Sequence, residues 1–144
     1  MAEALYKTDF YSWTQQQAGL IRQGRLGELD LDNILEEIES MGRSERRQLG
    51  HRLDVLLMHL LKWVYQPEQR SNSWKGSVME QRYRINRLLK ANPGLKPEIT
   101  EIMSEAYDAA RITAFKETGL PENTFPEDCP WFFKQVMDNE FWPE

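Results

Sequence analysis

Apolar residues recur at helical spacing along almost the whole chain. The first such set consists of Phe10, Trp13, Gln17, Leu20 and Ile21. Steps of three and four residues place side chains on one face of an α-helix. Thr8 or Asp9 can cap the start of this helix, because a short polar side chain accepts free N–H groups of the first turn. Gly24 and Gly27 follow and loosen the chain, so we expect the helix to end before them.

A second helix is expected to begin at Asp30 or Asp32, either of which can act as its N-cap. Its apolar face is formed by Leu31, Ile34, Leu35, Ile38 and Met41. Gly42 follows this face, and glycine weakens a helix interior. We therefore expect Gly42 to break or bend the second helix.

A third helix is expected to start at Ser44 and to end near Tyr65, before Pro67. Its apolar residues cover more than half of the helix circumference and include Leu53, Leu56, Leu57, Leu60, Leu61, Trp63 and Val64. A helix that is apolar on so many sides is typical of the centre of a bundle. We therefore expect other helices to surround it.

Two further helices and a short one are expected in the second half of the chain. Ser71 or Ser73 can cap a fourth helix that reaches about Ala91. Pro97 suits the first turn of a fifth helix, and Gly119 is a typical left-handed cap at its end. An aromatic-rich tail follows, and a short helix can begin near residue 130.

No stretch shows the alternation of a strand, so the pattern predicts an all-α fold. We expect a single compact domain, residues 1–144, with five or six helices in a bundle-like arrangement around the apolar central helix. The length of 144 residues, with 40% hydrophobic and 28% charged residues, suits one globular domain.

Composition also limits the location and the chemistry that we expect. The longest uncharged apolar run is residues 55–58, far below the roughly 20 residues that cross a bilayer. The first residues lack the basic start and apolar stretch of a signal peptide. We therefore expect a cytoplasmic protein without membrane contact. Cys129 is the single cysteine, which excludes an internal disulfide and cysteine-rich zinc sites.

Charge is unevenly distributed along the chain. Residues 1–42 and 91–144 are acidic, with net charges of −5 and −7, whereas residues 43–90 carry +7. The acidic ends can pack beside the basic middle, or the middle can face a polyanion. The basic face that we consider for nucleic acid consists of Arg43, Arg46, Arg47, Arg84 and Arg87.

Several short stretches together carry a family resemblance. They are residues 6–13, 29–33, 36–42 and 59–63, followed by Gln66-Pro67, Arg70, Ser73-Trp74, Gln81-Arg82, Tyr107, Ala110-Arg111, Phe125-Pro126 and Cys129-Pro130. In this combination the chain resembles the domain of unknown function 29 family of bacterial proteins. The resemblance implies a compact all-helical domain of about this length. It implies no reaction, cofactor or catalytic residue.

One candidate polar cluster follows from the residues themselves. Asp32, Glu36 and Glu39 share one helix stripe, and His59 lies at the rim of the apolar surface of the third helix. Arg82 falls within the apolar stripe of the fourth helix, and a buried cation demands a partner. The residues that we expect to meet between the second, third and fourth helices are Glu36, Glu39, His59 and Arg82. Glu37 is a further carboxylate that can form an ion pair with Arg82.

A second candidate site lies around the turn after the third helix, where Trp63, Arg70, Trp74 and Lys75 combine indole and basic groups. Such residues can stack bases and hold phosphates. They can equally close the end of a helical core, with arginine over an indole face. We favour the second interpretation.

These patterns lead to three functional hypotheses. No nucleophile elbow or phosphate-binding loop is present, so we assign no catalytic residue, metal or cofactor. We expect a non-enzymatic interaction module that binds another protein. The alternatives are nucleic-acid binding through the basic middle segment, and a metal-dependent enzyme that uses Glu36, Glu39 and His59. The sequence leaves the oligomeric state, the partner and the ligand open.

Overall fold

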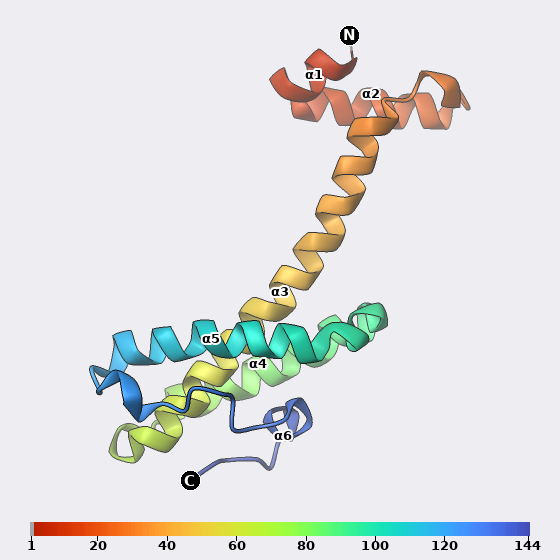
Figure 1. Ribbon diagram of the computed structural model, residues 1–144. Helices are drawn as coiled ribbons and strands as arrows, with labels where there is room; N and C mark the ends of the chain where they lie inside the picture. Colours follow the sequence, from red (N-terminus) through yellow and green to blue (C-terminus); the bar gives the residue numbers. More distant parts are fainter. Residues whose placement is uncertain (1) are drawn as a thin grey trace. The chain divides into compact units, whose positions relative to one another are not determined.

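The computed structural model describes residues 2–144, except for the side chain of Glu3 (Figure 1). These residues form six α-helices and no β-strand, which confirms the predicted all-α fold. The chain divides into two compact units, Met1–Ser44 and Glu45–Glu144, and each unit is described separately below. That the whole chain forms a single domain stays a prediction.

The first unit contains helix α1 (Ala2–Thr8), helix α2 (Phe10–Arg22), a short 3₁₀ helix (Leu26–Glu28) and the beginning of helix α3 (Leu31–Tyr65). Asp9 caps α2, as predicted: its carboxylate accepts hydrogen bonds from the backbone N–H (3.1 Å) and the hydroxyl (2.7 Å) of Ser12. The sequence pattern did not predict α1.

An aromatic group centred on Trp13 holds the first unit together. Trp13 is only 3% exposed, and its ring lies 4.8 Å from that of Tyr6 and 5.6 Å from that of Phe10. The indole Nε1–H donates to Asp30 Oδ2 at 3.0 Å, and Gln17 Oε1 accepts from the backbone N–H of Asp30 at 2.8 Å. These bonds attach α2 to the residue that precedes α3.

Helix α3 continues through Gly42, so the predicted break is wrong. Gly42 lies inside the helix, and the two glycines with positive φ are Gly24 and Gly119. One helical glycine costs only about 1 kcal/mol relative to alanine, and the flanking residues continue the hydrogen-bonded ladder. Ser44 therefore lies in the interior of α3 and caps no separate helix.

The second unit surrounds the C-terminal half of α3, as predicted. Helices α4 (Asn72–Ala91), α5 (Ile99–Thr118) and α6 (Phe133–Met137) belong to it and lie around this half of α3 in Figure 1. Fully buried side chains at 0% exposure come from α3, α4, α5 and α6: Leu49, Leu53, Leu56, Leu57, Leu60, Leu61, Val78, Ile85, Ala114 and Val136. The central apolar helix is therefore confirmed for this unit.

Helix ends in the second unit follow the predicted caps. Ser71 Oγ accepts the backbone N–H of Trp74 at 3.2 Å at the start of α4. Gly119 adopts the left-handed conformation after α5, with φ of 69°, where a side chain is strained. Pro97 differs from the prediction, because it lies in a 3₁₀ helix (Pro93–Glu98) that precedes α5.

The C-terminal tail packs onto the helices of the second unit. Phe125 is 1% exposed, and the Tyr107 hydroxyl donates to Pro126 O at 2.6 Å. Burial raises the pKa of the Tyr107 phenol and that of the half-buried Cys129 thiol. A thiol with a raised pKa is a poor nucleophile, so Cys129 is poorly suited to nucleophilic chemistry.

Candidate functional site

The first turns of α3 carry a row of exposed apolar side chains. Leu31, Leu35, Ile38 and Met41 are 64%, 56%, 55% and 61% exposed, respectively. Because successive residues of a helix are separated by about 100°, these four fall within one face about 120° wide. We call this set the apolar stripe. The sequence predicted these residues as one apolar face, and the structure shows that Leu31, Leu35, Ile38 and Met41 on it are exposed.

Carboxylates line one edge of the apolar stripe. Asp32, Glu36 and Glu39 are all exposed and share a face that begins beside Leu35. We call these three residues the acidic row. Arg43 Nη2 donates to Glu36 Oε1 at 3.0 Å, and this exposed pair leaves the row with a net negative charge.

The other edge of the apolar stripe is occupied by the helices of the first unit. The Tyr6 hydroxyl donates to Glu37 Oε2 at 2.6 Å. This hydrogen bond, together with burial, raises the pKa of Tyr6 to about 12. Ile34 is half-buried, in contrast to its neighbour Leu35. The exposed surface therefore has a structured boundary on one side and negative charge on the other.

The predicted polar cluster is divided between the two units. Glu36 and Glu39 belong to the first unit, whereas His59 and Arg82 belong to the second. The prediction treated the residues before and after Gly42 as two separate helices, whereas they form the continuous helix α3. Glu36, His59 and Arg82 each have a polar partner within their own unit.

His59 is half-buried on the C-terminal half of α3. Its Nδ1–H donates to Val55 O at 2.9 Å. Burial lowers the pKa of His59, and the positive charge of Lys62 lowers it further. The imidazole is therefore neutral at neutral pH, with its hydrogen bond directed to the helix backbone.

Arg82 fastens the C-terminal tail to α4, and the prediction that a glutamate partners it is wrong. The residue is 1% exposed. Its Nε donates to Val136 O and its Nη2 donates to Phe141 O, both at 2.7 Å. The guanidinium carbon lies 5.1 Å from the centre of the Trp142 ring. Burial lowers the pKa of Arg82, and two carbonyl oxygens take the place of a carboxylate.

The predicted aromatic and basic group lies at the end of α3, in the second unit. Arg70 lies 4.8 Å from the centre of the Trp63 ring, and its Nε donates to Trp63 O at 2.8 Å. Trp142 from the tail packs against Trp63 with ring centres 4.8 Å apart. Lys75 Nζ lies 5.6 Å from the centre of the Trp142 ring. The arginine over an indole face is confirmed, and these contacts close one end of the helical core.

Trp74 contacts a cation that lies on α3. Lys62 is 8% exposed, and its Nζ lies 4.7 Å from the centre of the Trp74 ring. The same Nζ donates to Glu117 Oε1 at 2.9 Å. Sequence reasoning missed both Lys62 and Glu117, because their pairing depends on the packing of α5 beside α3.

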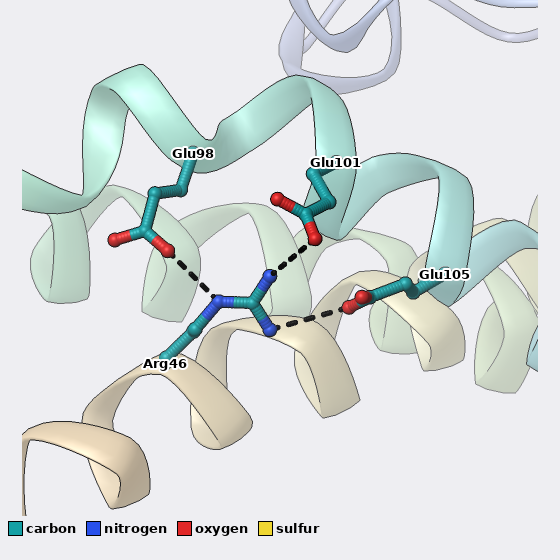
Figure 2. A network of polar contacts seen from close by, with 4 residues as sticks. All are labelled: Arg46, Glu98, Glu101 and Glu105. Atoms are coloured by element: carbon teal, nitrogen blue, oxygen red, sulfur yellow. Dashed lines mark hydrogen bonds and ion pairs between the residues drawn. The ribbon is translucent and has the colours of Figure 1, made fainter.

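Three of the five predicted basic-face arginines, Arg43, Arg46 and Arg84, pair with carboxylates. Arg84 pairs with Glu80 on its own helix. Figure 2 shows Arg46 between Glu98, Glu101 and Glu105, with N–O distances of 2.9, 3.7 and 3.2 Å. Arg43 is paired with Glu36. The positive charge of Arg43 and Arg46 is therefore largely cancelled.

Basic groups also gather between α3 and α4 in the second unit. A groove of about 510 Å³ is lined by Glu45, Gln48, Arg52, Arg84, Arg87, Leu88, Ala91 and Asn92. Arg84 Nε donates to Glu80 Oε2 at 2.9 Å, whereas Arg87 Nη1 donates to the Tyr83 hydroxyl at 2.9 Å. Arg52 was missed by sequence reasoning. Arg47 does not line the groove.

The donor geometry of a metal site is absent from residues 2–144. In this part of the chain, no group of three or more His, Cys, Asp or Glu residues is placed to hold a metal ion. Glu36, Glu39 and His59 thus do not assemble into a metal site. Among the same residues, no helix is long and apolar enough to cross a membrane.

Residues 2–144 define a small all-α protein with an apolar core in the second unit and an exposed, acid-bordered helix face in the first. The chain belongs to the family described as Domain of unknown function DUF29, which it matches over residues 5–142. The resemblance noted from the sequence is therefore confirmed over nearly the whole chain. Neither a curated protein nor a solved structure matches the chain.

Proposed function

We propose that this protein is a non-enzymatic interaction module that binds a basic amphipathic segment of another polypeptide chain. The observation that carries the proposal is the apolar stripe, whose four large side chains are each more than half exposed. Contiguous exposed apolar surface bordered by charge is typical of an interaction site.

The physical basis is the removal of apolar surface from water. Burial of apolar area contributes roughly 25 cal/mol per Å², and an amphipathic helix presents its apolar side chains at the same spacing as the apolar stripe. The acidic row adds selectivity, because it attracts Lys and Arg beside the apolar contact and repels an acidic partner.

The structure gives less support to the two alternatives. Metal-dependent catalysis lacks a cluster of donors within residues 2–144. Nucleic-acid binding through the predicted basic face loses the charge of Arg43 and Arg46 to carboxylates. We therefore propose neither of them as the function.

The test uses a synthetic 18-residue helical peptide of leucine and lysine in amphipathic order, with a fluorescent label. We expect the wild-type protein to bind this peptide, and we expect the double variant Leu35→Glu/Ile38→Glu to bind at least about tenfold more weakly, because a charge replaces each apolar contact. Ile112→Glu is the matched control, since Ile112 is 63% exposed on α5.

A second peptide with glutamate in place of lysine distinguishes recognition of charge from nonspecific hydrophobic binding. It should bind the wild-type protein weakly, because its carboxylates meet the acidic row. Equal binding of the leucine-lysine peptide by wild type and double variant, with unchanged circular dichroism, contradicts the proposal.

A further inference from the structure

We propose that the basic amphipathic segment is helix α4 of a second copy of this chain, so that the protein associates with itself. This inference rests on the proposed function and identifies the partner. It is carried by a second exposed surface, on α4, which combines exposed apolar side chains with charge opposite to that of the acidic row.

The outer face of α4 is apolar and basic. Met79 and Tyr83 are both 57% exposed and are separated by one helical turn. Three exposed cations follow on the same side of the helix, and we call the five residues together the α4 outer face: Met79, Tyr83, Arg84, Arg87 and Lys90. Val78, Arg82 and Ile85 point into the core instead.

The charge of the α4 outer face is mostly available to a partner. Glu80 pairs with Arg84, Glu45 lines the same groove as Arg84 and Arg87, and Glu140 lines a hollow with Met79 and Tyr83. Arg87 donates a hydrogen bond to a neutral group, the Tyr83 hydroxyl. Its guanidinium carbon lies 5.7 Å from the centre of the Tyr83 ring. A neutral hydrogen bond leaves the positive charge uncompensated.

The charged parts of the two surfaces have similar lengths. With a rise of 1.5 Å per residue, the acidic row spans about 10 Å between Asp32 and Glu39, and the cations span about 9 Å between Arg84 and Lys90. Both surfaces place their charged residues beside apolar residues on a helix. Carboxylates of the acidic row can thus face cations of the α4 outer face while Met79 and Tyr83 pack against the apolar stripe.

Charge also selects this pairing over the simpler ones. Two apolar stripes packed together bring two acidic rows close to each other, and two α4 outer faces bring six cations together. Like charges in close contact oppose association. Each copy carries one surface of each kind, so that a second copy offers a surface of opposite charge to either of them.

The experiment measures the mass of the intact protein by sedimentation equilibrium, after nuclease treatment and at low salt. We expect a dimer at about 100 μM, and we expect added salt to weaken it, because the charge pairs lie at an exposed interface. A wild-type protein that stays monomeric at this concentration overturns the inference. In that case the leucine-lysine peptide still decides the proposed function independently.

Charge reversal then identifies the surfaces. The row variant is Asp32→Lys/Glu36→Lys/Glu39→Lys, and the α4 variant is Arg84→Glu/Arg87→Glu/Lys90→Glu. Each variant alone should raise the dissociation constant on the order of 100-fold, because every charge pair becomes a like-charge pair. An equimolar mixture should associate again, because lysines of one variant then face glutamates of the other.

The matched control is Lys96→Glu/Lys116→Glu/Lys134→Glu, which makes the same change of net charge at exposed positions elsewhere in the second unit. It should leave the dimer intact. Dimerisation that survives the α4 variant, or two variants that fail to associate when mixed, overturns the inference. If a reversal disturbs the circular dichroism, the neutral changes Glu36→Gln and Arg87→Gln must each weaken the dimer in the same direction.

Discussion

The two halves of helix α3 have similar sequence patterns and opposite environments. In the C-terminal half, Leu53, Leu57 and Leu60 are fully buried, whereas Leu31 and Leu35 near the N-terminus are 64% and 56% exposed. Both sets recur at helical spacing on one continuous helix. The comparison shows that periodicity determines which side chains share a face, and that other elements determine whether the face is covered.

The extent of the apolar surface differs between the halves. Around residues 53–64 apolar side chains cover more than half of the circumference, and α4 and α5 pack there. Around residues 31–41 they form a single stripe beside the acidic row. A partner can bury a narrow apolar stripe while the charged residues at its edge stay in contact with water. An apolar centre with a polar rim is typical of an interface.

The largest expected difference between the two halves comes from the same substitution made in each. Leu57→Ala should lower the free energy of unfolding by about 2–5 kcal/mol, because it opens a cavity in the core. Leu35→Ala should change it by less than about 0.5 kcal/mol in the absence of a partner. Urea unfolding followed by tryptophan fluorescence and far-UV circular dichroism measures both. Similar losses in the two variants would mean that the apolar stripe is covered.

The next largest effect is expected from the loss of the hydrogen bonds by which Arg82 holds the C-terminal tail against α4. Arg82→Met should lower the free energy of unfolding by about 2 kcal/mol, because it leaves the carbonyls of Val136 and Phe141 without their donor. Arg84→Met is the matched control on the exposed side of the same helix, with an expected change below about 0.5 kcal/mol. If Arg82→Met is as stable as the wild type or more stable, the hydrogen bonds of Arg82 to the tail are not required for stability.

A smaller increase in stability is expected from a substitution at Gly42, between the two halves of α3. Gly42 is exposed, and a Cβ added there meets no atom within 4 Å. Gly42→Ala should therefore stabilise α3 by about 0.5–1 kcal/mol, seen as slower amide hydrogen exchange around residue 42. Gly119→Ala provides the contrast, since φ of 69° there makes the substitution unfavourable. Faster exchange in Gly42→Ala would show that α3 needs a flexible junction.

The smallest effect is the dependence of stability on pH that arises from His59, in the C-terminal half of α3. Burial lowers the pKa of His59 in the folded protein, so the unfolded chain takes up this proton first as the pH falls. The contribution of His59 to stability is thus complete above about pH 6.5 and is lost as the pH falls through the folded-state pKa.

The test compares urea midpoints between pH 7.5 and pH 5.5. His59→Gln should reduce their dependence on pH, whereas His51→Gln should not, because the His51 side chain is 74% exposed. An equal pH dependence in wild type and His59→Gln excludes this role of His59.

The sequence by itself determined the helical class, the faces of the helices and several of their ends. These features depend on neighbours within a few residues: the carboxylate of Asp9, the hydroxyl of Ser71 and the left-handed Gly119 act on their own helix termini. The acidic row was also visible, because spacing along a helix is a local property. The error at Gly42 arose from the same local rule, since one glycine is too weak to end a helix whose flanking turns are stable.

Only the tertiary structure decided what each face meets. The partners of Arg82 are carbonyls more than fifty residues away, and the three glutamates around Arg46 come from residues 98–105. Such pairings depend on how helices pack, and many arrangements of the same charges satisfy the same sequence pattern. The exposure of the apolar stripe is of this kind, because burial is a property of the neighbours that a residue has in space and not of its own side chain.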